Sequence, residues 1–476
     1  MPESVEELAA DSRWPAMFPS PMCFVTTADG SGTALERVVG ASIVNRFPYV
    51  LAISLCREDV SMRHHARRTF CDILEGGECA AVQFLPRGAA TDRALVVISS
   101  IPERHTRERV GASGLWTRDA VTANVPVFND AYMVYEGRLA RPGTDFEGRA
   151  IYDAPWIDVG SHRVYFLEVR AIQLRRDIAR GKSKILWRSL PSWRPRLNAA
   201  GTRRATDKAP VRTDFTKGFS PSYEFPSADT VAYESDGQWK GMSVKLIPRS
   251  PAGQLEVDND RARWPCFFPS PVGMITTWAR EGVPDLMPCG STCVVSRRPF
   301  VVAPCVAYAA INDRYKPRRT LQAIRRSGRF GCGVPYIDDT IVEAIRYAGT
   351  RSIDDDPDKL ANAGLEVEGA EGTPLLSALP IHFDCRIVGE VRLGTHVMFL
   401  GEVDSIRVRA DVTPENPIRW CPWPEVTDGR PSGASEQIVS ERSLPRGEIA
   451  PATGDIGTDV KRRDARRMQA QPIQSE

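Results

Sequence analysis

The chain has 476 residues, of which 42% are hydrophobic and 26% are charged, the balance of an ordinary soluble globular protein. This composition excludes a disordered or collagen-like chain, and the length corresponds to about three domains. Lys and Arg number 62 against 60 Asp and Glu, and the resulting net charge of +2 favours neither a nucleic-acid partner nor a polybasic membrane contact.

The sequence shows no pattern of a membrane span, a signal peptide or paired cysteines. No apolar run reaches the ~18 residues that span a bilayer, and the acidic N-terminus has no apolar core of a signal peptide. The 11 cysteines are scattered without a CxxC pair, which indicates free thiols in a reducing compartment and no metal site. We therefore expect a cytoplasmic protein with no membrane partner.

An internal repeat organises the chain. Residues 14–27 read WPAMFPSPMCFVTT and residues 264–277 read WPCFFPSPVGMITT, with 8 of 14 positions identical. The pairing continues in order, down to Gly160-Ser161-His162 and Gly394-Thr395-His396, with an extra stretch in the first copy around 141–159. We interpret this as one fold present twice, because self-similarity at a fixed offset is the signature of repeated units.

The predicted boundaries follow from this repeat. They are a first, more divergent copy at 12–193, a partly irregular linker at 194–261, a second copy with a fuller motif set at 262–424, and a polar tail at 425–476. The tail is poor in apolar residues and is expected to be disordered.

Strand patterns dominate within the copies. In chain order they cover Val164–Val169, Thr230–Leu246, Val272–Thr277, Pro284–Val295, Phe300–Val306 and Val397–Val403. Helix patterns are few and cover Thr320–Ser327 and Asp355–Ala363. Many short strands with few short helices predict a mainly β fold, with a β-barrel in each copy.

Four features of the second copy, in this order, resemble the flavin reductase-like, FMN-binding split-barrel family. They are the opening strand 272–277, the small and hydroxyl-bearing segment 289–300, an Arg-Thr-Leu helix start at 319–321 leading to 328–335, and the ending Gly394-Thr-His with Phe399-Leu-Gly-Glu-Val. The resemblance covers both copies and implies two FMN-binding split barrels. Because family members are usually homodimers, it also implies that the copies form an intrachain pseudo-dimer, with further oligomerisation left open.

The resemblance implies FMN as the cofactor, with FAD as the alternative, and NAD(P)H as co-substrate. A phosphate needs hydroxyls, backbone N–H groups and cations, and a helix N-terminus with Arg and Thr offers them. The candidate flavin-binding residues are Ser291, Thr292, Arg314, Lys316, Arg318, Arg319 and Thr320 in the second copy, and Ser42, Arg68 and Thr69 in the first. The alternative interpretation of the Arg/Thr segments is a solvated basic loop.

His396 and His162 are the candidate catalytic residues, because the resemblance places this histidine beside the flavin and the substrate. The alternative is a histidine that caps the start of a strand. His382 and Cys385 are spaced like a pair of metal ligands, but the predicted strand there favours burial.

Three functions remain open. The first is an oxidoreductase of the flavin reductase type, which transfers hydride between NAD(P)H and flavin and supplies a flavin-dependent monooxygenase. The second is a dedicated flavoenzyme that acts on a small-molecule metabolite with bound FMN. The third is a non-enzymatic flavin-binding or scaffold protein.

Overall fold

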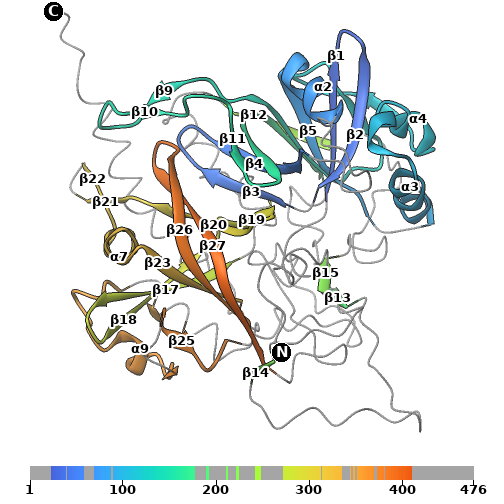
Figure 1. Ribbon diagram of the computed structural model, residues 1–476. Helices are drawn as coiled ribbons and strands as arrows, with labels where there is room; N and C mark the ends of the chain where they lie inside the picture. The colour runs from blue at the N-terminus through green and yellow to red at the C-terminus, as the bar shows by residue number, and fades with distance from the viewer. Residues whose placement is uncertain are drawn as a thin grey trace, which may run out of the picture.

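The computed structural model describes residues 23–38, 40–57, 69–86, 89–176, 189–191, 211–212, 221–223, 242–247, 268, 272–311, 314–334, 344, 347–348, 351–368, 372–379 and 381–409. These residues form two large antiparallel sheets with a few short helices (Figure 1). The prediction of a mainly β fold is confirmed.

The N-terminal part of the chain builds a nine-stranded sheet. Its main path runs β2 (Gly32–Val38), β1 (Cys23–Asp29), β5 (Cys79–Phe84), β8 (Met133–Leu139), β12 (His162–Arg175), β4 (Val50–Cys56) and β3 (Gly40–Asn45). Two further strands, β11 (Trp156–Val159) and β16 (Met242–Leu246), pair with β12. The helices of this part are α2 (Thr69–Gly77), which packs on β1, α3 (Ala89–Ser100) and α4 (Arg109–Ala112).

The C-terminal part builds an eight-stranded sheet. Its main path runs β18 (Val283–Cys289), β17 (Gly273–Arg280), β23 (Arg329–Val334), β26 (Ile381–Arg392), β27 (His396–Arg409), β20 (Phe300–Ala307) and β19 (Thr292–Arg297), and β14 (Val211–Arg212) pairs with β27. Helix α7 (Arg319–Ser327) packs on β17, and α9 (Lys359–Asn362) lies by β18. Strand for strand, the order of the main path is the same in the two sheets.

The remaining secondary structure of the described residues consists of short two-stranded ribbons and one short helix. The ribbons are β9–β10 (Gly143–Thr144 and Ala150–Ile151), β6–β7 (Thr117–Asp119 and Pro126–Phe128), β13–β15 (Ser189–Pro191 and Pro221–Tyr223), β21–β22 (Ala309–Ile311 and Arg314–Lys316) and β24–β25 (Val367–Glu368 and Leu375–Leu376). The helix is a 3-10 turn at Glu103–His105. The segment predicted as a linker thus contributes β14 and β16 to the two sheets.

One predicted strand is divided and one predicted helix is shortened in the structure, while the strands predicted at 164–169 and 397–403 are longer. The strand expected over Pro284–Val295 is two strands, because the chain bends at Gly290–Ser291, where the Ser291 carbonyl accepts a hydrogen bond from the Cys305 amide at 2.8 Å. The helix expected over Asp355–Ala363 is only Lys359–Asn362, since the preceding aspartates form a turn on the Ser352 carbonyl. Of the predicted strand Thr230–Leu246, Met242–Leu246 is observed, and 230–241, like the predicted tail, lies outside the described residues.

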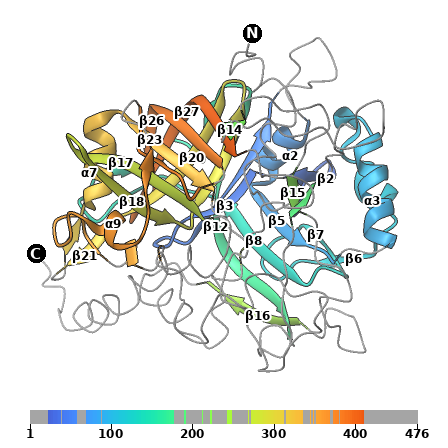
Figure 2. The ribbon, with the colours of Figure 1, turned by 90° about the horizontal axis from the view of Figure 1, so that it is seen from below.

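The two sheets share an apolar core where β3 and β4 meet β19 and β20. Figure 2 shows β3 next to β20 at this junction. This core contains Val44 and Val50 from the first sheet and Val295 and Val301 from the second, all at most 1% exposed. The Ser54 hydroxyl donates to the Val295 carbonyl across the junction, at 2.7 Å. The apolar side chains at the junction are therefore as fully buried as those in the core of either sheet, and burial of apolar area is the main stabilising term.

Candidate functional site

The two candidate histidines begin equivalent strands. His396 is the first residue of β27 and faces Ala307 of β20, while His162 is the first residue of β12 and faces Cys56 of β4. In each case a hydroxyl precedes the histidine, and its oxygen lies close to the ring Nδ1 atom, at 3.0 Å for Thr395 and 2.9 Å for Ser161. His396 is partly exposed, whereas His162 is buried with 8% exposure.

Both histidine segments lie against a turn of the other sheet. A cis peptide bond joins Phe47 to Pro48 in one turn, and another joins Arg298 to Pro299 in the other. The Ser161 amide donates to the Arg298 carbonyl at 2.7 Å, and Asn45, three residues before Pro48, contacts Thr395 and His396. The surroundings of each histidine are thus built from both halves of the chain.

The N-terminus of α7 retains the features of an anion site. The N-cap residue makes no side-chain hydrogen bond to this nine-residue helix and no acidic residue lies in its first turn. The positive end of the helix dipole therefore favours an anion there. Arg318, the N-cap residue, is half-buried, and burial lowers its pKa. In the part of the chain that the structure describes, no carboxylate pairs with Arg318.

The two candidates next to Arg318, Arg319 and Thr320, bind other side chains of the protein. Exposed Arg319 forms an ion pair with Asp354 and donates to the Gln322 side chain at 3.0 Å. The buried Thr320 hydroxyl donates to the Asp285 carboxylate at 2.6 Å. Of the three predicted residues at this helix start, Arg318 is therefore the cation best placed to meet an added phosphate.

The remaining predicted residues are dispersed. Thr292 and Ser42 are fully buried, and their hydroxyls donate to the carbonyls of Cys289 at 3.1 Å and Ile43 at 3.4 Å, so both contact the core. Ser291 lies at the bend before β19 and is partly exposed. Others occupy the segments leading to or starting the helices: exposed Lys316 and the backbone of Arg314 in β22, and Thr69 at the start of α2. Arg68 lies outside the described residues.

An aromatic cluster that sequence reasoning missed lies between His396 and α7. Phe146, from the β9–β10 ribbon of the first half, packs its ring on Tyr308 at 5.1 Å and on Tyr315 at 4.5 Å between centroids. Tyr308 follows β20, and its amide donates to the Thr395 carbonyl at 2.9 Å. The extra stretch of the first copy thus reaches the histidine segment of the second.

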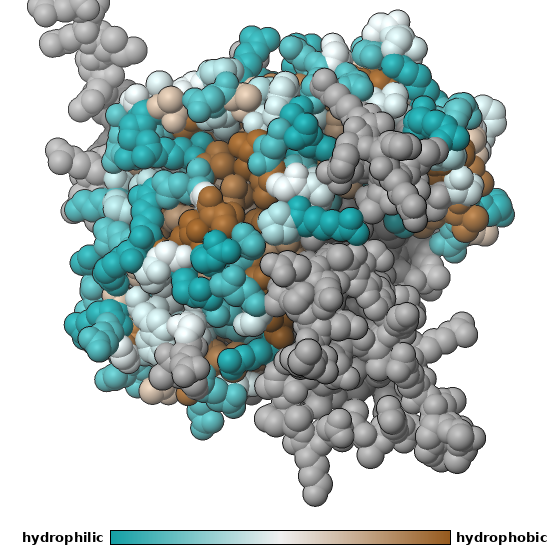
Figure 3. Space-filling model, in the orientation of Figure 1, coloured by the Kyte–Doolittle hydropathy of each residue, from teal (hydrophilic) through white to brown (hydrophobic). Residues whose placement is uncertain are grey.

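The surface beside this histidine segment is apolar. In the space-filling view, hydrophobic side chains gather left of centre, over the region where β3 and the β26–β27 hairpin lie in Figure 1, and hydrophilic side chains surround them (Figure 3). Such a patch with a few polar groups at its edge is typical of a site for a flat organic ligand.

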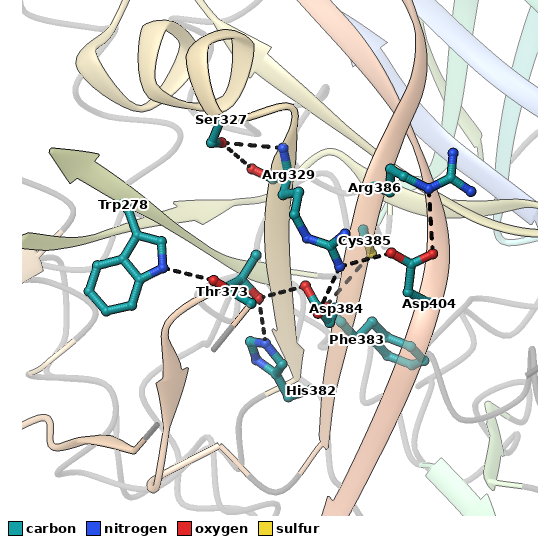
Figure 4. Close-up of polar contacts among 11 residues, drawn as sticks. Trp278, Ser327, Arg329, Thr373, His382, Phe383, Asp384, Cys385, Arg386 and Asp404 are labelled. Atoms are coloured by element: carbon teal, nitrogen blue, oxygen red, sulfur yellow. Dashed lines mark hydrogen bonds and ion pairs between the residues drawn. The ribbon is translucent and has the colours of Figure 1, made fainter. Parts of the chain in front are cut away.

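A polar cluster of partly and fully buried side chains lies on β23 and β26 of the second sheet and on the neighbouring Thr373 (Figure 4). The Thr373 hydroxyl donates to Asp384 at 3.0 Å and lies 3.2 Å from Nε2 of His382, while Asp384 also pairs with Arg329 at 2.9 Å. Burial lowers the pKa of His382 to about 4, and its Nδ1 has no hydrogen-bond partner among the described residues. With Cys385 fully buried as well, the prediction of burial for this pair is confirmed.

The structure is of the mainly β class, with two antiparallel sheets of the same strand order. His396, the start of α7 and an apolar surface lie at the second sheet. Residues 265–422 match the family model described as "Flavin reductase like domain". This match spans every strand from β17 to β27.

A curated relative agrees with this match. "Flavin reductase (NADH)" of Kitasatospora aureofaciens is 26% identical over 168 residues, which are 34% of this chain and 80% of that protein.

Two solved structures are also similar. Nitrilotriacetate monooxygenase component B (homolog) from Mycobacterium thermoresistibile is 26% identical, with 30% of this chain and 72% of that chain covered and a TM-score of 0.26. Flavoredoxin of Desulfovibrio vulgaris (Miyazaki F) is 21% identical, with 32% and 76% covered and the same TM-score. None of the helices in the described ranges is long and apolar enough to cross a membrane.

Proposed function

We propose that the chain is an FMN-binding oxidoreductase of the flavin reductase type, which transfers hydride between NAD(P)H and flavin. The observation that carries this proposal is the family match over 265–422, which contains His396, the aromatic pair Tyr308 and Tyr315, and the start of α7. The similarity to an NADH flavin reductase over 80% of that protein's length supports the same reaction.

The site in the second half fits FMN. Its phosphate would lie at the α7 N-terminus with Arg318, because a half-buried cation that pairs with no carboxylate among the described residues favours an anion at a helix N-terminus. Tyr308, Tyr315 and Phe146 would line the ring, with His396 beside it. When bound, FMN supplies the hydride-carrying ring, and this chain supplies binding and orientation.

The two halves, 12–193 and 262–424, would form an intrachain pseudo-dimer that arose by duplication. Equal strand order, helices α2 and α7 on equivalent strands and the paired contacts between histidine segments and cis-proline turns support this. The buried apolar junction between β3–β4 and β19–β20 makes independent folding of either half unfavourable.

One observation favours a dedicated flavoenzyme as the second candidate. Phe146 comes from a segment of the first half that has no counterpart between β26 and β27, yet it contacts the proposed flavin site of the second half. An added side chain at one site only is the expected mark of selection for a particular small-molecule substrate. A reductase that only releases reduced flavin to a monooxygenase has less need of it.

A visible spectrum of the purified full chain, followed by NADH and NADPH oxidation with and without added FMN, tests the proposal. Oxidation of the nicotinamide that requires FMN supports a flavin reductase. A bound flavin that the nicotinamide reduces, but that is reoxidised fast only by an added metabolite, supports the second candidate. A chain that neither binds FMN nor oxidises NADH or NADPH contradicts both.

A further inference from the structure

Asn45 of the first sheet contacts the histidine segment of the second. Its side-chain Oδ1 lies 3.1 Å from the Thr395 hydroxyl and 3.2 Å from Nδ1 of His396. Asn45 is 1% exposed and lies at the end of β3, just after a bulge. Asn45 and His396 are 351 positions apart in the chain, and the junction of the two sheets brings them together.

The orientation of the Asn45 amide follows from its other contact. Its Nδ2 atom donates to the Pro48 carbonyl at 2.7 Å. The reversed orientation would place Oδ1 against that carbonyl, two acceptors facing each other, which is unfavourable. Oδ1 is therefore the atom that faces Thr395 and His396, and it can only accept.

This acceptor selects one form of the His396 ring. The Thr395 hydroxyl has a single proton and lies within hydrogen-bond distance of both Oδ1 and Nδ1. When the Thr395 hydroxyl donates its proton to Oδ1, an unprotonated Nδ1 would face two oxygens that offer it no proton. A hydrogen bond between Nδ1 and these oxygens then requires a proton on Nδ1. A neutral ring protonated on Nδ1 has an unprotonated Nε2, which is a hydrogen-bond acceptor.

In the second sheet, the position that corresponds to Asn45 is occupied by a serine. Ser296 lies just after the matching bulge of β19, three residues before Pro299, as Asn45 lies three before Pro48. Its hydroxyl is buried and has no hydrogen-bond partner among the described residues, so it supplies nothing to the ring of His162. The Nδ1 of His162 lies 2.9 Å from the Ser161 hydroxyl.

We propose that Asn45 is a positioning residue that fixes the Nδ1-protonated form of His396 and thereby makes the second half the working site. This inference rests on the proposed function, in which His396 lies beside the flavin. Asn45 does not touch the flavin in this arrangement and acts through His396.

Nitrogen-15 NMR of histidine-labelled full chain tests the ring directly, because the six histidines give few signals and His396→Gln identifies its own. At neutral pH we expect His396 protonated on Nδ1. Asn45→Ala and Asn45→Ser, which copies Ser296, should give a mixture of the two neutral forms. Loss of this hydrogen bond should lower the kcat of FMN-dependent NADH oxidation by about tenfold, with the Kd of FMN within about twofold.

Two matched variants provide the controls. Ser296→Ala changes the equivalent buried position and should alter neither the His396 signal nor kcat. Thr395→Val removes the hydroxyl but leaves Asn45, so His396 should stay protonated on Nδ1. An unchanged His396 signal in Asn45→Ala overturns the inference, and so does a changed signal with unchanged kcat. If the wild-type chain oxidises no NADH, the proposed function fails, while the NMR comparison still decides whether Asn45 fixes the ring.

Discussion

Gly160 packs against the backbone of Arg298 more closely than any other residue type would allow. A Cβ atom on Gly160 would lie 2.1 Å from the Arg298 carbonyl oxygen, and Gly160 has a φ of +54°. The same arrangement occurs in the other direction, where a Cβ on Gly394, with a φ of +112°, would lie 2.5 Å from the Phe47 carbonyl oxygen. Each glycine lets a histidine segment approach the opposite cis-proline turn.

Gly160→Ala and Gly394→Ala should each lower the free energy of unfolding by about 2–5 kcal/mol, from an unfavourable backbone conformation plus a clash with fixed backbone. Urea unfolding of the full chain measures this. Gly148→Ala and Gly282→Ala are matched controls, because both glycines have positive φ but no atom within 4 Å of the added Cβ. Their loss should be only about 1–2 kcal/mol. Equal losses in the variants and the controls would contradict the close contact.

Arg318→Gln should weaken FMN about tenfold or more and riboflavin little, because a charge-assisted hydrogen bond contributes roughly 1.5–3 kcal/mol and riboflavin has no phosphate. Fluorescence titration of the full chain with both flavins measures the difference. Arg319→Gln is the control, since Arg319 is occupied by Asp354. If Arg319→Gln shows the selective loss and Arg318→Gln does not, the phosphate is not where we place it.

A buried ion pair joins α9 to β18. Nζ of Lys359 lies 2.5 Å from Oδ1 of Asp285, and the two side chains are 3% and 1% exposed. Lys359→Met should destabilise the chain by about 3–5 kcal/mol, because it leaves a buried carboxylate without its cation. Adding Asp285→Asn should recover most of this loss, since an amide oxygen still accepts from Thr320. Thermal unfolding of the single and double variants checks the coupling, and simple additivity would rule it out.

Stability should decrease in acid through His382. Burial holds the pKa of His382 at about 4, below the 6.5 of the unfolded chain, so the folded protein keeps the ring neutral while the unfolded chain binds a proton. The free energy of unfolding therefore keeps its full value above pH 6.5 and falls by about 3 kcal/mol as the pH decreases to about 4. Urea unfolding from pH 4 to 7 should show a shallower pH dependence for His382→Gln. Parallel curves would show that another group titrates.

Much of the fold follows from local patterns. The β-branched run at 272–277 and the apolar run at 300–306 are strands whose ends lie within three residues of the predicted ones, and the helix at Thr320–Ser327 is α7 extended by Arg319. These segments are predictable because the period of apolar residues and the neighbouring turn residues agree with the tertiary environment. Helix α3 was not predicted, because its run of Leu95, Val96, Val97 and Ile98 has no clear helical period.

The site was predictable only in part. The motif around His396 and the Arg/Thr helix start lie within short segments, which a sequence motif can indicate. Asn45 and Phe146 reach this region from the other half of the chain, and no local signal marks either residue. The side chain of Arg319 is engaged by Asp354, a residue 35 positions away in the sequence, and no local pattern distinguishes it from Arg318.

The difference between Asn45 and Ser296 has a genetic consequence. In a dimer of identical chains, one codon determines both of the residues that symmetry relates, so every substitution changes the two interfaces together. Here Asn45 and Ser296 are specified by two codons of one gene. A mutation in the codon of Asn45 changes the surroundings of His396 and leaves the residues around His162 unchanged. Selection can therefore preserve one ligand site and release the other for a different use within the same folded chain.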